Sequence, residues 1–142
     1  MKLSEIKDMM DKDSIIDPAH LDVASLALPY LHSKWYNIFI EELRLLKGLD
    51  NEFNLLLKEK TEYYLGKAPD ESYQLKPLHL KILKQDVEIY LKADEDLIAS
   101  DSKRILQKIK VEAVESYIKN INNRGFMIKN AIDFRKFVNG VN

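Results

Sequence analysis

Cysteine is absent from the 142 residues of this chain. Disulfide bonds and thiolate metal sites are therefore excluded, and the composition fits a reducing compartment such as the cytoplasm. Glycine and proline are also rare, with four of each. Because residues that break helices are scarce while leucine, isoleucine, lysine and glutamate are abundant, the sequence predicts an all-α protein.

Long hydrophobic runs are missing as well, since no segment approaches the roughly 18 uncharged apolar residues of a membrane-spanning helix. The N-terminal segment MKLSEIKDMMDKD is too acidic and too interrupted by charge to be a signal peptide. We therefore expect a protein of the cytoplasm with no membrane partner.

Charge is balanced over the whole chain but not along it. The formal net charge is -1, yet residues 103–142 hold nine basic and three acidic residues, a net charge of +6 against -7 for the remainder. Apolar residues make up 46% of the chain, which is enough for the core of one domain. Basic residues gathered at one end are compatible with a polyanionic ligand.

The longest periodic segment covers residues 30–65. Its apolar residues recur at spacings of three and four, which places them along one side of a helix roughly 54 Å long. They are Trp35, Ile38, Leu45, Leu46, Leu49, Phe53, Leu56 and Tyr63. Shorter helices are expected over residues 3–10 and from Asp17, a good N-cap that precedes Pro18. Pro29 is expected to kink the chain or to separate two helices.

The second half of the chain is expected to hold three further helices. Residues 66–69 end the long helix, and a helix over 77–94 would fold back on it as a hairpin. The Asp-Ser pair at 101–102 can cap the next helix, and the Asn-Asn-Arg-Gly segment at 122–125 would end it. Residues 126–140 then form a short terminal helix.

Catalytic and metal-binding motifs are lacking in this sequence. The three histidines have no acidic partner at the spacing of helical metal sites, and no HExxH pattern, glycine-rich phosphate loop or GxSxG elbow is present. The sequence therefore predicts no enzyme and neither a metal nor a cofactor.

The end of the long helix carries the segment KEKTEYYLGK, from Lys58 to Lys67. At about 100° per residue, Lys60, Tyr64 and Lys67 share one side of the helix end, while Lys58 and Tyr63 diverge from it. Cations for phosphates and aromatic faces for unstacked bases are the ingredients of single-strand binding. Spacing alone favours the alternative, in which the lysines form a solvated face and the tyrosines close the hairpin.

Four stretches of the sequence stand in a characteristic order: HSKW at 32–35, LLLKEKTEYYLGKAPDESY at 55–73, LKADEDL at 91–97 and INNRGFMIKNAIDFRKFVNG at 121–140. Together they resemble the UvsY family of recombination mediators from T-even-type phages. Proteins of this family are non-catalytic and helical, and they bind single-stranded DNA. They help a RecA-like recombinase to replace a single-strand-binding protein. The resemblance also implies a closed homo-oligomeric ring of about six or seven subunits.

The resemblance assigns roles to particular residues. It implies that Lys58 and Lys60 contact single-stranded DNA, and that the C-terminal region assembles the ring. Glu59 departs from the family motif and adds a negative charge among the cations. The expected DNA-binding set is Lys58, Lys60, Tyr63, Tyr64 and Lys67, and the secondary candidates are Arg124, Lys129 and Arg135.

An apolar face follows residue 101 and exceeds what a slender hairpin can cover, which is typical of an interface. Its residues are Ile105, Ile109, Val114, Ile118 and Ile121. We therefore expect residues 1–100 to form a helical region with the DNA-binding motif and residues 101–142 to form the oligomerisation region. The alternative is a helical scaffold that oligomerises through this face without binding DNA.

Overall fold

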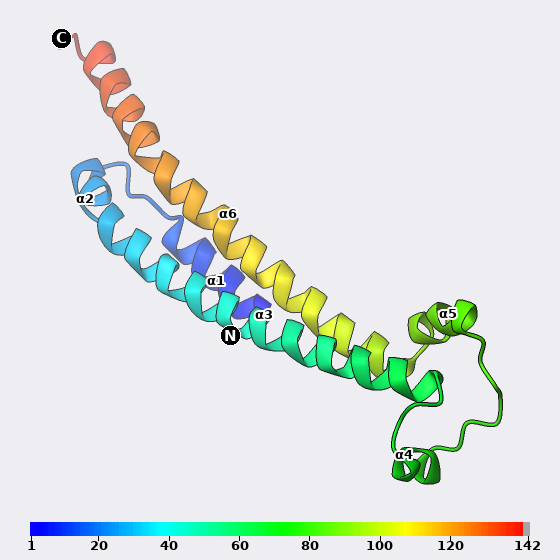
Figure 1. The fold of residues 1–142 in the computed structure, drawn as a ribbon. Coiled ribbons are helices and arrows are strands. Elements are labelled where there is room, and N and C mark those ends of the chain that lie inside the picture. Colours follow the sequence, from blue (N-terminus) through cyan, green and yellow to red (C-terminus); the bar gives the residue numbers. More distant parts are fainter. Residues whose placement is uncertain (141–142) are drawn as a thin grey trace. The chain divides into compact units, whose positions relative to one another are not determined.

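The computed structural model describes residues 1–140, which form helices joined by turns and irregular segments (Figure 1). The helices are α1 (Leu3–Asp13), α2 (Leu21–Leu26), α3 (Leu28–Tyr64), α4 (Asp70–Leu75), the 3-10 helix η1 (Lys84–Asp86), α5 (Val87–Lys92) and α6 (Glu95–Val138). No strand occurs among residues 1–140, and the predicted all-α class is confirmed. Within the same range, none of the helices has the length and apolar character needed to cross a membrane.

The chain forms two compact units. We call Met1–Leu43 with Ile109–Asn142 the terminal unit and Arg44–Lys108 the central unit. Helices α3 and α6 each contribute a segment to both units. The expected division at residue 100 concerns DNA binding and assembly rather than compactness, and it stays a prediction.

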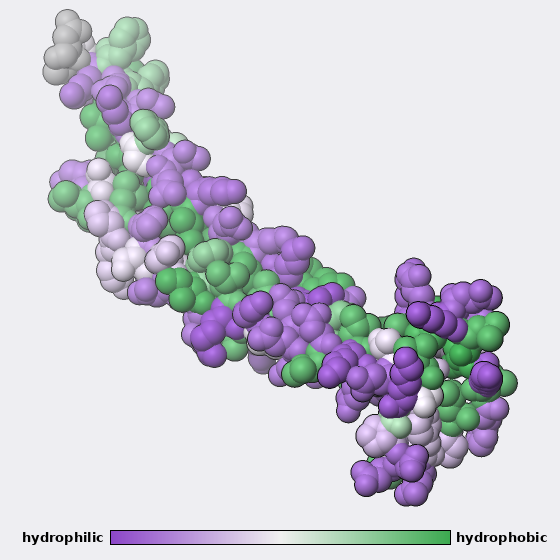
Figure 2. All heavy atoms as spheres, in the orientation of Figure 1, coloured by the Kyte–Doolittle hydropathy of each residue, from purple (hydrophilic) through white to green (hydrophobic). Residues whose placement is uncertain are grey.

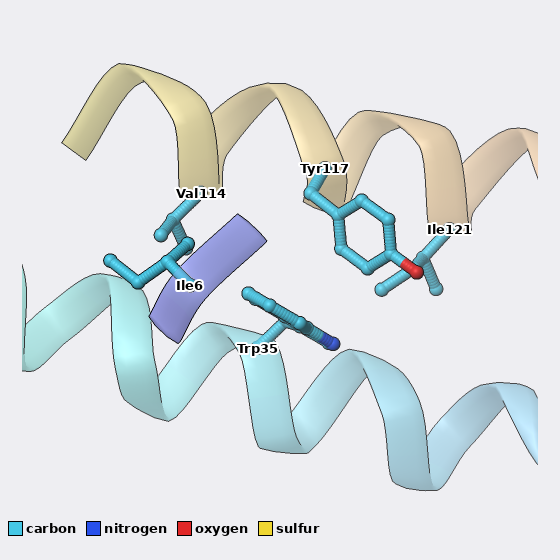
Figure 3. Packing of buried hydrophobic residues seen from close by; sticks show 5 residues of the cluster. All are labelled: Ile6, Trp35, Val114, Tyr117 and Ile121. Atoms are coloured by element: carbon cyan, nitrogen blue, oxygen red, sulfur yellow. The ribbon is translucent and has the colours of Figure 1, made fainter. Parts of the chain in front are cut away.

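The terminal unit is built around an apolar core. Figure 3 shows Ile6 from α1, Trp35 from α3, and Val114, Tyr117 and Ile121 from α6 converging on one another. The rings of Trp35 and Tyr117 lie 4.6 Å apart between centroids and are tilted by 59°. Fully burying side chains of this size contributes about 1.5–3 kcal/mol each, so this cluster holds the three helices together.

The central unit joins its α3 and α6 segments with polar contacts. The two segments are antiparallel, because Asp50 lies beside Arg104 whereas Lys60, further along α3, lies beside Asp96 at the start of α6. Helices α4 and α5, with η1 between them, belong to the connection. The predicted hairpin therefore exists, but α6 rather than residues 77–94 forms its second arm.

The end of α3 agrees with its prediction. Gly66 has a φ of +77°, a left-handed conformation that glycine adopts without steric cost. The N–H of Gly66 donates to the carbonyl of Tyr63 at 3.1 Å, and the N–H of Lys67 donates to that of Glu62 at 2.9 Å. This pair of bonds is a Schellman cap, which satisfies carbonyls that the helix leaves without partners.

The predicted helix over residues 77–94 is wrong. Only η1 and α5 are helical there, and most residues between Lys76 and Lys81 are exposed. A short helix needs an apolar face to bury, because its own hydrogen bonds barely offset the loss of chain entropy. Without such burial, this segment remains irregular.

The two predicted C-terminal helices are one helix of 44 residues, α6. It begins at Glu95 instead of at the Asp-Ser pair 101–102, and it continues through the expected stop at 122–125. Gly125 costs about 1 kcal/mol in a helix. The burial of Ile121 and Ile128 on either side outweighs that cost, since each apolar side chain contributes about 1.5–3 kcal/mol.

The first predicted helix boundary also needs correction. Asp17 closes a turn by accepting the N–H of Ala19 at 2.9 Å, and the helix α2 begins at Leu21 instead of Pro18. Pro29 separates two helices as expected. It lies in the first turn of α3, where the missing N–H has no helical partner to lose.

Candidate nucleic-acid interface

Lys60 is held by two carboxylates at the start of α6. Its Nζ lies 2.7 Å from Oδ2 of Asp96 and 3.5 Å from Oδ2 of Asp94. The hydroxyl of Tyr64, one turn further along α3, donates to Oδ2 of Asp94 at 2.6 Å. We call these four residues the Lys60 network. They bring Lys60 and Tyr64 together as predicted, but each side chain binds a carboxylate of its own chain.

Asp94 occupies the N-cap of α6. Its Oδ1 accepts the N–H of Leu97 at 3.0 Å, and its side chain is only 2% exposed. A carboxylate at this position satisfies a free N–H and faces the positive end of the helix dipole. Asp94 is therefore a buried part of the fold, whereas Asp96 remains 66% exposed.

The pKa values of Lys60, Tyr64 and Asp94 reflect their contacts within the Lys60 network. Burial by itself raises the pKa of Asp94, but hydrogen bonds from Tyr64 and from the Leu97 N–H, together with the ammonium of Lys60, outweigh burial and lower it. Burial lowers the pKa of Lys60, but the hydrogen bond to Asp96 and the charge of Asp94 raise it. Burial and the bond to Asp94 both raise the pKa of Tyr64. The network is therefore an ion pair with a neutral tyrosine at neutral pH.

Tyr63 lies in the interior of the central unit. Its side chain is buried, and its hydroxyl donates to the carbonyl of Lys76 at 2.9 Å. Its ring stacks on Tyr73 at 5.3 Å between centroids, and the Tyr73 hydroxyl donates to the carbonyl of Tyr63 at 2.8 Å. These contacts fasten the connection after α3 to the end of that helix. For Tyr63, these contacts agree with the alternative prediction, in which the tyrosines close the hairpin.

Lys58 and Lys67 are the exposed cations of the predicted set. The side chain of Lys58 is 76% exposed, and its Nζ lies 3.9 Å from a carboxylate oxygen of Glu62, one turn along α3. Lys67 follows the Schellman cap and is exposed. Both side chains can reach a phosphate without disturbing a buried contact.

The secondary candidates for DNA binding also divide into buried and exposed side chains. Arg124 is buried, and its guanidinium donates to the carbonyl of Asp13 at 2.8 Å and to the hydroxyl of Tyr117 at 3.0 Å. It therefore fastens the terminal unit and is poorly placed for a phosphate. Lys129 and Arg135 are exposed on α6.

The predicted oligomerisation residues do not form one exposed face. Val114 and Ile121 are buried in the terminal unit's own core, and Ile118 packs against that core. Ile105 and Ile109 are 51% and 45% exposed, respectively. Figure 2 shows further hydrophobic side chains at the surface of the C-terminal part of α6, beside hydrophilic ones. The exposed residues there include Phe126, Met127, Phe134, Phe137 and Val138.

Sequence reasoning missed Asp94, Asp96 and Tyr73 as parts of this region. A signal for Asp94 was present, because an aspartate followed by two acidic residues and a leucine is a typical helix start. The contacts of Tyr73 depend on the path of an irregular segment, which leaves no periodic signal. Among residues 1–140, no group of histidine, aspartate and glutamate side chains could hold a metal ion.

Comparison with known proteins identifies relatives over nearly the whole length. A family model described as "Recombination, repair and ssDNA binding protein UvsY" matches residues 9–141. The recombination protein uvsY of Enterobacteria phage T4 is 24% identical over 140 residues, which cover 99% of each chain.

The fold is shared with crystal structures of the bacteriophage T4 recombination mediator protein UvsY. One crystal lattice gives a TM-score of 0.86 at 25% identity, with 96% of this chain and 97% of that chain covered. Another gives 0.82 at 23% identity, with 96% and 98% covered.

Proposed function

The chain belongs to the UvsY family of recombination, repair and single-stranded-DNA-binding proteins, and we propose that it acts as a recombination mediator. In this role it binds single-stranded DNA and helps a RecA-like recombinase to displace a single-strand-binding protein. The family match over residues 9–141 carries the proposal. The exposed cations Lys58 and Lys67 at the end of α3 support a DNA contact there.

We further propose that the protein has no catalytic activity and works in the cytoplasm of a phage-infected cell. Binding energy alone can drive the exchange of partners on DNA. A strand held in a conformation that the recombinase prefers and the single-strand-binding protein does not would shift the equilibrium between them. Nucleotide turnover then belongs to the recombinase.

A homo-oligomeric ring of about six or seven subunits completes the proposed mechanism. One subunit offers few exposed cations, and each phosphate contact releases a limited number of counterions. Repeating the contacts of Lys58 and Lys67 around a ring gives avidity along one strand without a strong single site. Exposed Ile105 and Ile109 and the exposed C-terminal part of α6 supply apolar surface for assembly.

The proposed DNA site is tested by replacing Lys58 and Lys67 together with alanine. We expect weaker binding to mixed-sequence oligonucleotides and a flatter dependence of log K on log salt, because phosphate contacts are lost. Replacing Lys7 and Lys12, two exposed lysines of α1, is the matched control for net charge. Equal effects of the two pairs would remove Lys58 and Lys67 from the site. Failure of the wild type to bind DNA at low salt would favour the scaffold alternative.

An alanine variant of Lys60 cannot separate DNA contact from stability. Lys60→Ala would leave the Asp94 carboxylate without its cation, so a loss of DNA binding could follow from a loss of structure. Lys58→Ala and Lys67→Ala leave the Lys60 network intact. They separate DNA contact from stability.

Assembly is tested at Ile109. We expect Ile109→Asp to weaken the oligomer far more than Lys110→Ala, because a carboxylate in a dry interface costs several kcal/mol. Since Ile109 is exposed within its own chain, helicity should survive the substitution. Sedimentation with parallel thermal melts distinguishes the outcomes: a variant that keeps its oligomeric state excludes Ile109 from the interface.

A further inference from the structure

Asp96 and Asp94 hold the same ammonium in unequal ways. Asp94 is 2% exposed, and its two oxygens are engaged by the Tyr64 hydroxyl and the Leu97 N–H. Asp96 is 66% exposed, and its Oδ2 lies 2.7 Å from Nζ of Lys60. Asp94 is therefore a fixed part of the fold, whereas Asp96 can leave Lys60 by a rotation of its own side chain into solvent.

The Lys60–Asp96 pair also borders a free volume. A pocket of about 480 Å³ is lined by Lys60, Asp96, Tyr63 and Lys76, among others. Pockets of this size admit a small ligand. The wall also holds a second cation, Lys76, and the carboxylates of Glu59 and Glu62, so a phosphate in this pocket would meet Lys60 and Lys76 on a wall that acidic side chains share.

We propose that Asp96 is a competitor for DNA: its carboxylate occupies the Lys60 ammonium in the free protein, and a backbone phosphate of single-stranded DNA takes its place in the complex. This inference rests on the proposed DNA-binding function and adds a residue that limits affinity. A carboxylate and a phosphate oxygen accept the same charge-assisted hydrogen bond from an ammonium, so one can replace the other. Asp94 stays bound to Lys60 throughout and keeps the ammonium in position.

The exchange predicts a larger gain in DNA affinity than the relief of general charge repulsion does. Removing the negative charge of any acidic residue near the strand should raise affinity slightly through long-range attraction. Removing that of Asp96 should do more, because the phosphate no longer has to displace a bound carboxylate. The displaced carboxylate also recruits cations, which offsets part of the counterion release from DNA, so Asp96→Asn should make the salt dependence steeper.

The test compares Asp96→Asn with Glu95→Gln in the full-length protein. Glu95 is the neighbouring residue in the first turn of α6, is exposed, and loses the same charge at the same helix end. Fluorescence anisotropy with a mixed-sequence oligonucleotide measures affinity over a range of salt concentrations. We expect Asp96→Asn to bind about two- to fivefold more tightly than Glu95→Gln at low salt, the range that exposed ion pairs allow.

Two further variants locate the effect at Lys60. Asp96→Glu keeps a carboxylate within reach of Lys60 and should bind DNA like the wild type. In a Lys60→Gln background, the advantage of Asp96→Asn over Glu95→Gln should disappear, because no ammonium remains to be released. The glutamine amide can still donate to Asp94, and thermal melts confirm that each variant is folded.

The outcomes separate this inference from the proposed function. If the wild type binds DNA but Asp96→Asn matches Glu95→Gln, the competition is overturned and the proposed function stands. If the advantage over Glu95→Gln persists in the Lys60→Gln background, Asp96 acts on DNA without Lys60 and the inference is equally wrong. If neither the wild type nor Asp96→Asn binds DNA, both fall.

Discussion

The two units hold their interior cations in different ways. In the terminal unit, the guanidinium of Arg124 binds neutral acceptors: the Asp13 carbonyl, the Tyr117 hydroxyl and the Asn120 side-chain oxygen. In the central unit, the ammonium of Lys60 binds the carboxylates of Asp94 and Asp96. Both cations come from sequence segments that favoured DNA binding, and neither projects freely into solvent.

The two cations differ in what their release would cost. The acceptors of Arg124 come from α1 and α6 and lie beside an apolar core, so releasing the guanidinium would leave buried polar atoms without partners. The carboxylate of Asp96 lies at the surface, and water solvates it when it leaves Lys60. The terminal unit thus uses its cation for stability, whereas the central unit holds the one that a phosphate would reach in the proposed exchange with Asp96.

The largest expected effect removes the core of the terminal unit. Trp35 is fully buried, packs against the tilted ring of Tyr117 and donates its indole N–H to Asp13 at 2.9 Å. Trp35→Ala should lower the free energy of unfolding by about 3–5 kcal/mol, as large-to-small substitutions in cores do. Urea unfolding followed by circular dichroism at one fixed protein concentration measures it. Tyr36→Ala, at an exposed neighbouring aromatic residue, should cost less than about 1 kcal/mol. Similar losses would contradict the placement of the core.

A smaller effect is expected in the central unit from Asp94→Ala. The substitution removes the N-cap of α6 and leaves the Tyr64 hydroxyl without its acceptor. Together these losses should cost about 2–3 kcal/mol in urea unfolding. Asp96→Ala removes only an exposed partner and should cost less than about 1 kcal/mol. Equal costs for Asp94 and Asp96 would show that the two carboxylates do not differ in role.

The pH dependence of stability tests the role of Asp94 in the Lys60 network. Because the pKa of Asp94 is lowered by folding, its contribution is present above the ordinary value of 3.8 and is lost as pH falls through the folded pKa. Tyr64 has a raised pKa, so its contribution is present below the ordinary value of 10.0 and is lost as pH rises above it. Stability measured between these limits should be flat for this network. In Asp94→Asn, the acid-side loss should be smaller than in the wild type, and an identical acid limb would refute the coupling.

The smallest effects concern one glycine in each unit. Gly125 is helical, and a Cβ there would lie 3.6 Å from Cδ1 of Leu28, an ordinary contact. Gly125→Ala should therefore stabilise the terminal unit by about 0.5–1 kcal/mol. Gly66 has a positive φ, so Gly66→Ala should instead destabilise the end of α3 by about 1–2 kcal/mol. Thermal melts of the two variants should move in opposite directions, and a destabilised Gly125→Ala would mean that α6 cannot take a side chain there.

The fold class and the ends of α3 follow from residues that are close together in the sequence. Helix-favouring composition gave the all-α class, the glycine at position 66 ended α3, and Pro29 lies in its first turn. The resemblance of four sequence stretches to the UvsY family is confirmed by the family match over residues 9–141. These features depend on residues near one another in the chain, so a linear pattern contains them.

Which helices pair and which charged residues are buried depends on contacts between residues that are far apart in the sequence. The segment at 122–125 has good stop residues, yet α6 continues because Ile121, Arg124 and Ile128 find partners in or near the core. Lys60 and Asp94 are 34 residues apart, and neither sequence neighbourhood reveals the other as its partner. Helix propensities are worth tenths of a kcal/mol per residue, whereas burial and buried hydrogen bonds are worth one to several, roughly. Where the two conflict, long-range contacts decide, and such contacts become visible only once the chain has folded.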